Sequence, residues 1–273
     1  MRKILYLLFA ISFLSCASQQ QNQLINPNGK TVKERFSVPP GFRRIEDPNS
    51  TLDEFLRNLP LKPNHTNVYL FNGKLKTKQN VHEAVINYDI GKKDLQQCAD
   101  AVMRLRAEYL YSSNQFEKIA FNFTNGTRAE FSKYGDGYRY NAKTNKWVKS
   151  TGPDFTYENF CSFMELVYTY AGTLSLSKEL IAVKNINEIK PGDVFIKGGS
   201  PGHAVTVLDV AKNPETNITI FILAQSYMPA QNIHVLKNFN LPIMSPWYST
   251  DFGQELITPE WTFSKNELMR FQE

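Results

Sequence analysis

"IKPGDVFIKGGSPGHAVTVLDVAKNPETNITIFILAQS", residues 189–226, places three apolar runs around two turn signals. The first signal is GGSPG and the second is KNPETN, and clusters of Gly, Pro, Ser and Asn of this kind separate strands. Short apolar runs divided in this way predict three consecutive antiparallel strands. Because helical patterns precede this stretch, we expect an α+β fold in which helices are grouped beside an antiparallel sheet.

The second turn predicts a register for the last two strands. If it is centred on Pro214, the numbers of facing residues add up to 428, and His203 faces Gln225. Facing residues lie on one side of a sheet with Cβ atoms about 5 Å apart. A slip of one residue would bring in Ala224 or Ser226 and reverse the facing. An amide oxygen beside an imidazole can hold the ring in one tautomer, as the third group of a nucleophile–base site does.

Two longer helices are predicted, and each contains a cysteine. "TYENFCSFMELVYTYAG", residues 156–172, predicts a helix over 157–170 that ends at Gly172. Cys161 lies beside its apolar stripe and within its first turns, where the helix dipole lowers a thiol pKa and free N–H groups can receive an oxyanion. "DLQQCADAVMRLRAEYLY", residues 94–111, predicts a second helix capped by Asp94. Cys98 falls on the apolar stripe of that helix, which favours burial as a small hydrophobe.

Shorter elements are also predicted from local patterns. Residues 52–59 should form a helix that Pro60 ends, and a short helix is expected near the C-terminus. Alternating apolar and polar residues over 68–73 and 82–90 indicate two strands. The segment from 35 to 273 is therefore expected to form a single α+β domain.

Part of the chain resembles a known enzyme family. "FCSFMELVYTYAG", then "IKPGDVFIKGGSPGHAVTVLDV", then "FILAQS" are similar in order and type to cell-wall cysteine peptidases of the NlpC type, in the papain-like superfamily. The resemblance implies a papain-like core over about 151–230. It also implies Cys161 as nucleophile, His203 as general base and Gln225 as the residue that orients the ring. The implied substrates are the stem peptides of peptidoglycan.

The whole chain also resembles an uncharacterised family of lipoproteins from Bacteroidota. Segments such as "DLQQCADAVMRLRAEYLY" and "LAQSYMPAQ" carry this resemblance. It implies a location in the cell envelope and no particular activity.

Other interpretations of the same residues stay open. Cys161 could pack in the interior or form a disulfide with Cys98, and His203 could be a hydrogen-bonded histidine at a turn. A strand containing His82 followed by the Cys98 helix is the order found in circularly permuted relatives. The orienting role assigned to Gln225 could be filled instead by one of three other polar residues: Gln231, His234 or Ser226.

The N-terminus predicts export and lipidation. "MRKILYLLFAISFLSC" has a basic start, a short apolar run and a small residue before Cys16, as in bacterial lipoproteins. We expect a signal peptide over 1–15, acylation of Cys16 and a polar flexible tether over 16–34. Cys16 would then attach the protein to the membrane through its lipid. Ala17 and Ser18 do not include the aspartate that retains lipoproteins in the inner membrane, so the expected location is the periplasmic side of the outer membrane.

Charge and composition exclude several classes of function. Removing residues 1–15 removes only Arg2 and Lys3, so the formal charge falls from +5 to +3. This charge is spread along the chain, which argues against nucleic acid as a partner. The four histidines are too far apart to predict a metal site, and no cofactor motif is present. Two hypotheses result: a lipid-anchored cysteine hydrolase acting on peptidoglycan peptides, or a papain-like binding or scaffold lipoprotein without turnover.

Overall fold

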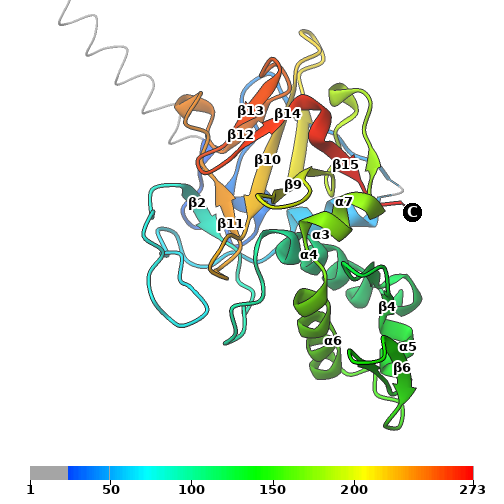
Figure 1. Cartoon of the computed structure of the whole chain (residues 1–273). Helices are drawn as coiled ribbons and strands as arrows, with labels where there is room; N and C mark the ends of the chain where they lie inside the picture. The colour runs from blue at the N-terminus through cyan, green and yellow to red at the C-terminus, as the bar shows by residue number, and fades with distance from the viewer. Residues whose placement is uncertain (1–23, 49, 273) are drawn as a thin grey trace, which may run out of the picture.

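The computed structural model describes residues 24–48 and 50–272, and Cys16 with the predicted signal peptide lies outside them. The predicted strands form the centre of a large antiparallel sheet, with strand order β2-β11-β10-β9-β8-β15-β7 (Figure 1). In addition, β1 pairs with β9 and β12 pairs with β10. Its middle strands are β8 (Val194–Lys197), β9 (His203–Lys212) and β10 (Thr219–Gln225). Nearly all their residues are buried, as expected for continuous apolar runs covered on both faces.

Apart from the helices α4 and α6, the remaining elements are short. The helices are α2 (Val32–Arg35), α3 (Thr51–Arg57), α4 (Cys98–Ser112), α5 (Phe131–Gly135), α6 (Tyr157–Tyr170) and α7 (Thr173–Glu179). The other strands are β1 (Arg43–Arg44), β2 (His82–Val85), β3 (Ala120–Asn122), β4 (Arg128–Glu130), β5 (Tyr138–Asn141), β6 (Lys146–Lys149), β7 (Ile181–Ala182), β11 (His234–Leu236), β12 (Trp247–Ser249), β13 (Glu255–Ile257), β14 (Thr262–Ser264) and β15 (Leu268–Arg270). The fold is thus α+β, with an antiparallel sheet and helices beside it.

The predicted register of β9 and β10 is wrong by three residues next to the turn and by two residues beyond the bulge. Thr219 pairs with Lys212, and after a bulge beyond Ile222 the pairing continues to Ala224 opposite Thr206. The turn is wider than predicted because the Asn213 side chain accepts hydrogen bonds from the backbone N–H groups of two turn residues. Beyond the bulge, the shift of two residues keeps each side chain on its predicted face, whereas next to the turn the shift of three residues reverses the relative facing of the two strands. Consequently, the side chains of the first residue of β9 and the last of β10 still lie on one face, as diagonal neighbours.

Helix α4 begins three residues later than predicted. The Gln97 backbone N–H donates to Asp100 Oδ2 at 2.9 Å, which closes a capping box and starts the helix at Cys98. Asp94 does not cap the helix, because its Oδ1 accepts from the backbone N–H of Ala230 at 2.7 Å. Cys98 is therefore the first residue of α4, which packs against β9.

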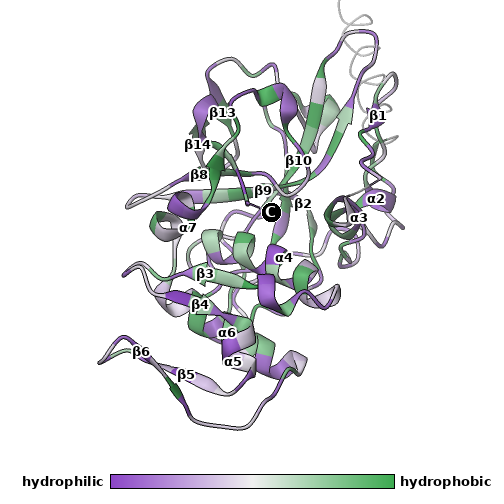
Figure 2. Ribbon diagram, turned by 90° about the vertical axis from the view of Figure 1, so that its right-hand side faces the viewer, coloured by the Kyte–Doolittle hydropathy of each residue, from purple (hydrophilic) through white to green (hydrophobic). Residues whose placement is uncertain are grey.

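Helix α6 has the predicted bounds, and its N-cap is Thr156, whose hydroxyl accepts from the Asn159 backbone N–H. The fully buried side chains of Phe160 and Phe163 pack with Phe131 of α5 rather than on the sheet. Figure 1 shows α6, α5, β4 and β6 together, on the far side of α4 from the large sheet. Figure 2 shows hydrophobic residues concentrated along β8, β9 and β10.

Two other short-element predictions are corrected by the structure. Residues 68–73 form no regular strand and make only isolated bridges, Tyr69 with Leu75 and Leu70 with Gln231. The C-terminal segment forms a 3-10 turn over Lys265–Glu267 and strand β15 rather than a helix. Within the described part of the chain, none of the helices has the length and apolar character needed to cross a bilayer.

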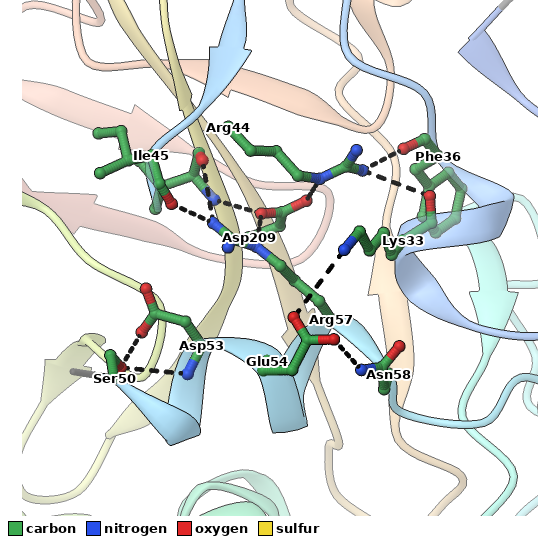
Figure 3. A network of polar contacts seen from close by, with 11 residues as sticks. Lys33, Phe36, Arg44, Ile45, Ser50, Asp53, Glu54, Arg57, Asn58 and Asp209 are labelled. Carbon is green, nitrogen blue, oxygen red and sulfur yellow. Dashed lines mark hydrogen bonds and ion pairs between the residues drawn. The ribbon is translucent and has the colours of Figure 1, made fainter. Parts of the chain in front are cut away.

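A buried carboxylate connects the N-terminal segment to the sheet (Figure 3). Asp209 of β9 is fully buried and forms ion pairs of 2.6 Å with Arg44 of β1 and Arg57 of α3. The Arg57 side chain is only 4% exposed. Because removal of one partner would leave a buried charge uncompensated, these contacts hold β1 and α3 against the strand that contains His203.

Candidate functional site

The structure brings His203 and Gln225 into direct contact. His203 is the first residue of β9 and Gln225 the last of β10, and His203 Nε2 lies 2.8 Å from Gln225 Oε1. Both residues are 1% exposed. Since an amide oxygen can only accept, the ring must carry its proton on Nε2, which leaves Nδ1 as the basic nitrogen.

The orientation of the Gln225 amide is itself held by a buried ion pair. Gln225 Nε2 donates to Glu260 Oε2 at 2.8 Å, and Glu260 Oε1 binds Lys76 Nζ at 2.8 Å. The Lys76 and Glu260 side chains are each 7% exposed. A carboxylate can only accept, so the amide nitrogen faces Glu260 and its oxygen must face His203. Glu260 lies between β13 and β14, and no sequence motif indicated this role.

Aromatic rings enclose the His203 imidazole. The ring centroid lies 4.8 Å from that of Tyr227, 5.3 Å from that of Trp261 and 5.8 Å from that of Phe263. Burial lowers the pKa of His203 to about 4, even though the hydrogen bond to Gln225 acts in the opposite direction. His203 is therefore a neutral base at neutral pH.

The cysteine that lines the same cavity as His203 is Cys98. We call this space of about 440 Å³ the thiol cavity; its lining also includes Asp100, Tyr168, Tyr227 and Trp261. Burial raises the pKa of Cys98 to about 11, while nearby backbone N–H groups, that of Ala99 foremost and that of Ala204 among them, favour the thiolate. As the first residue of α4, Cys98 lies among the N–H groups that a helix leaves unpaired. Those groups can receive an oxyanion.

The thiol and the imidazole line one cavity near the start of β9, but from opposite faces of the sheet. Cys98 contacts the backbone of Ala204, on the face of the sheet that α4 covers, whereas the His203 ring shares the opposite face with Phe263. Among residues 24–48 and 50–272, no hydrogen bond joins the Cys98 thiol to the His203 ring. Contacts between a nucleophile and its base are often long in a ligand-free site and tighten when substrate binds.

Cys161 lies in a neighbouring cavity. It is the fifth residue of α6 and half-buried, and it lines a space of about 410 Å³, here called the Gln96 cavity, with Gln96, Arg104 and Tyr168. Burial raises the pKa of Cys161, and the Arg104 charge acts against that rise. With Thr156 as N-cap, Cys161 is one turn too far along the helix to meet its unpaired N–H groups. Of the three predicted site residues, the structure thus joins His203 to Gln225 and puts Cys161 elsewhere.

The alternative orienting residues have other partners. Ser226 Oγ donates to backbone carbonyls, among them that of Gln231 at 2.9 Å, and Gln231 Nε2 donates to the Pro229 carbonyl at 3.0 Å. His234 Nδ1 contacts the Asn232 carbonyl at 2.8 Å. These polar groups hold the chain around the site.

The structure forms neither the circularly permuted arrangement, with His82 beside Cys98, nor a disulfide between Cys98 and Cys161. His82 Nε2 contacts the Thr66 carbonyl at 3.0 Å and lines a cavity that does not include Cys98. Both Cys98 and Cys161 are free thiols. In the described part of the chain, no three His, Cys, Asp or Glu side chains are grouped so that they could hold a metal ion.

The sequence contains a signal that places Cys98 at the start of its helix. Asp100 stands three residues after Gln97, the spacing of a capping box, which would have started the helix at Cys98. Taking Asp94 as the cap hid this start, because residues 95–97 lie outside the helix.

One protein family matches nearly the whole of the described chain. Its model, with the description "Domain of unknown function (4846)", matches residues 32–270. No curated protein matches the chain. No solved structure matches it either.

Proposed function

The chain belongs to this family of unknown function, and we propose that it is a cysteine hydrolase of peptide or amide bonds with Cys98 as nucleophile. One observation carries the proposal. A thiol at the start of a helix and an imidazole whose tautomer is fixed by Gln225 line one cavity. A helix N-terminus with a cysteine, packed on a sheet that presents histidine and a polar partner, is the papain-like arrangement. On this proposal, the resemblance to NlpC-type enzymes holds for His203 and Gln225, while the nucleophile moves from Cys161 to Cys98.

The proposed reaction has two steps. In the first, Cys98 Sγ attacks the substrate carbonyl carbon and His203 Nδ1 takes the thiol proton. The C–N bond then breaks, His203 gives that proton to the leaving nitrogen, and a thioester remains on Cys98. In the second step, water loses a proton to His203 and attacks the thioester, which releases a carboxylic acid and restores the thiol. Backbone N–H groups at the start of α4 stabilise the oxyanion in both steps.

The pKa values indicate the form in which the pair rests. With the Cys98 pKa at about 11 and the His203 pKa at about 4, thiol and imidazole are both neutral at pH 7. Moving the proton between them without substrate would cost on the order of 10 kcal/mol. His203 therefore acts as a neutral base during attack and does not maintain a preformed thiolate. Glu260 supports this role because it fixes the amide that fixes the ring.

We further propose peptidoglycan stem peptides as substrates and the periplasmic side of the outer membrane as location, with an acyl chain on Cys16 as the anchor. The supports are the N-terminal "LSC" segment and the similarity of the "PGD" and "GH" strands to cell-wall peptidases. Neither depends on which cysteine is the nucleophile.

A second function, binding without turnover, is favoured by the burial of the thiol. Cys98 is 8% exposed, its helix covers the face of the sheet opposite the His203 ring, and burial disfavours the thiolate. In that case the thiol cavity would hold a peptide or glycan in the same papain-like fold.

Digestion of purified peptidoglycan separates the two functions. We expect the wild type to release soluble peptides detectable by mass spectrometry, Cys98→Ala to release none, and the matched control Cys161→Ala to remain active. A wild type that binds the polymer without releasing peptides would support the binding function instead.

A further inference from the structure

The Gln96 cavity adjoins the thiol cavity. Leu95 and Tyr168 line both spaces, so a chain molecule lying against Cys98 could extend from one into the other. The Gln96 cavity contains no part of the His203–Gln225 pair.

Gln96 lines this space and has a side-chain donor that no described residue uses. The residue is 1% exposed, and its Oε1 accepts from Arg104 Nη1 at 2.8 Å. A guanidinium can only donate, so the amide orientation is determined, and Nε2 must be the atom on the other side. Within the described residues, Gln96 Nε2 is buried and has no hydrogen-bond partner.

Two further buried polar atoms near the start of α4 also have no hydrogen-bond partner among the described residues. Tyr168 Oη, on the wall common to both cavities, has no partner among the described residues, and neither has Asp100 Oδ1 in the thiol cavity. Buried polar groups in folded proteins are nearly always paired. A ligand that spans both cavities would pair them.

The charges around the Gln96 cavity favour an uncharged ligand. Arg104 is paired with Glu108 at 3.1 Å, and Lys93 at the rim is paired with Glu165 at 2.7 Å. Asp89 also lines the space, so the walls offer no excess positive charge for an anion. The rest of the lining is largely apolar and includes Tyr88, Phe160 and Met164.

We propose that the Gln96 cavity is a subsite for an uncharged peptide residue next to the bond presented to Cys98. Gln96 Nε2 and Tyr168 Oη donate hydrogen bonds to the carbonyl oxygen of that residue, and the aromatic walls cover its side chain. The identification of the ligand as a peptide rests on the proposed function. Binding in the cavity needs no turnover and can be measured separately.

Cys161 provides the readout because its half-buried thiol lines the cavity. In the Cys98→Ala protein, the rate of Cys161 alkylation by iodoacetamide is followed by peptide mapping. The probe is N-acetylalanine N′-methylamide, and N-acetylalanine, which ends in a carboxylate, is its charged counterpart. We expect the methylamide at millimolar concentration to slow the alkylation of Cys161 and the carboxylate to have little effect.

Two nearly isosteric variants test the donors. Gln96→Glu keeps an acceptor for Arg104 but removes the donor, and Tyr168→Phe removes only the hydroxyl. Each should raise the half-protecting concentration of the methylamide about three- to tenfold, the loss of one buried neutral hydrogen bond. Tyr170→Phe should leave this concentration unchanged, because Tyr170, two residues further along α6, lines neither cavity. If Gln96→Glu does not fold, Tyr168→Phe decides.

Three results would overturn the subsite: no protection by the methylamide, equal protection by the carboxylate, or undiminished protection in both donor variants. The hydrolase proposal fails by a different result, namely unchanged peptidoglycan digestion by Cys98→Ala. The two proposals can therefore fail independently.

Discussion

Alkylation of Cys98 as a function of pH tests the resting state of the proposed nucleophile. Burial raises the pKa of its thiol from the ordinary 9.0 to about 11. At pH 7 the thiolate fraction is then roughly a hundredfold lower than that of an ordinary cysteine, and the alkylation rate falls at least in proportion. Because the fraction grows tenfold per pH unit below the pKa, the rate should rise continuously from pH 6 to pH 10. His203→Asn should leave this profile unchanged, since a neutral imidazole does not stabilise a thiolate.

The assay is the second-order rate of iodoacetamide labelling, with peptide mapping to separate Cys98 from Cys161. Cys161 serves as internal reference because it is more exposed, and the urea-unfolded chain gives the rate of an unperturbed thiol. Labelling of Cys98 at pH 6 that is as fast as in the unfolded chain, and that is lost in His203→Asn, would refute the reasoning. Such a result would show a preformed thiolate–imidazolium pair.

Three other predictions concern buried ionisable side chains. Glu260→Ala should free the Gln225 amide to rotate, and should therefore lower the kcat of peptidoglycan digestion with little change in KM. Steady-state kinetics should also show partial rescue in Glu260→Gln. An equal change in KM would mean that Glu260 acts elsewhere. Asp209→Leu should lower the free energy of unfolding in urea by about 3 to 5 kcal/mol, because it leaves buried Arg57 uncompensated, and a loss below 1 kcal/mol would contradict the network. Burial holds the pKa of His203 at about 4 and that of His234 at about 3, below the 6.5 of unfolded histidine. Protons therefore bind the unfolded chain first, and the free energy of unfolding should fall from pH 6.5 towards pH 4, by roughly 3 kcal/mol for His203 alone. Urea midpoints should show this fall, with a shallower slope in His234→Asn.

Local sequence patterns correctly predicted α6, whose bounds depend only on neighbouring residues. The bounds of α6 follow from a capping threonine, an apolar stripe and a terminal glycine, which are all local, and the structure reproduces them. The contact between His203 and Gln225 was predicted on the correct face because alternation along a strand survives a shift of two residues. The register itself was wrong, since Asn213 bonds widen the turn.

The proposed nucleophile could not be identified from the pattern of one helix, because its position depends on contacts between distant segments of the chain. Cys98 looked like a core residue because its helix was started at Asp94, whereas Asp94 binds the distant Ala230 backbone. Cys161 had the better family resemblance, but α6 packs on the aromatic side chains of α5 and not on the sheet. Glu260 had no local signal at all, because its contact with Gln225 joins segments 35 residues apart.

The central claim, that Cys98 attacks with His203 as its base, is tested most directly by trapping the intermediate. Purified soluble muropeptides are incubated with the protein and quenched in acid, which preserves a thioester, and the modified cysteine is identified by peptide mapping. We expect an acyl group on Cys98 that is removed by hydroxylamine and is absent in His203→Asn. An acyl group on Cys161, or continued turnover in Cys98→Ala, would contradict it.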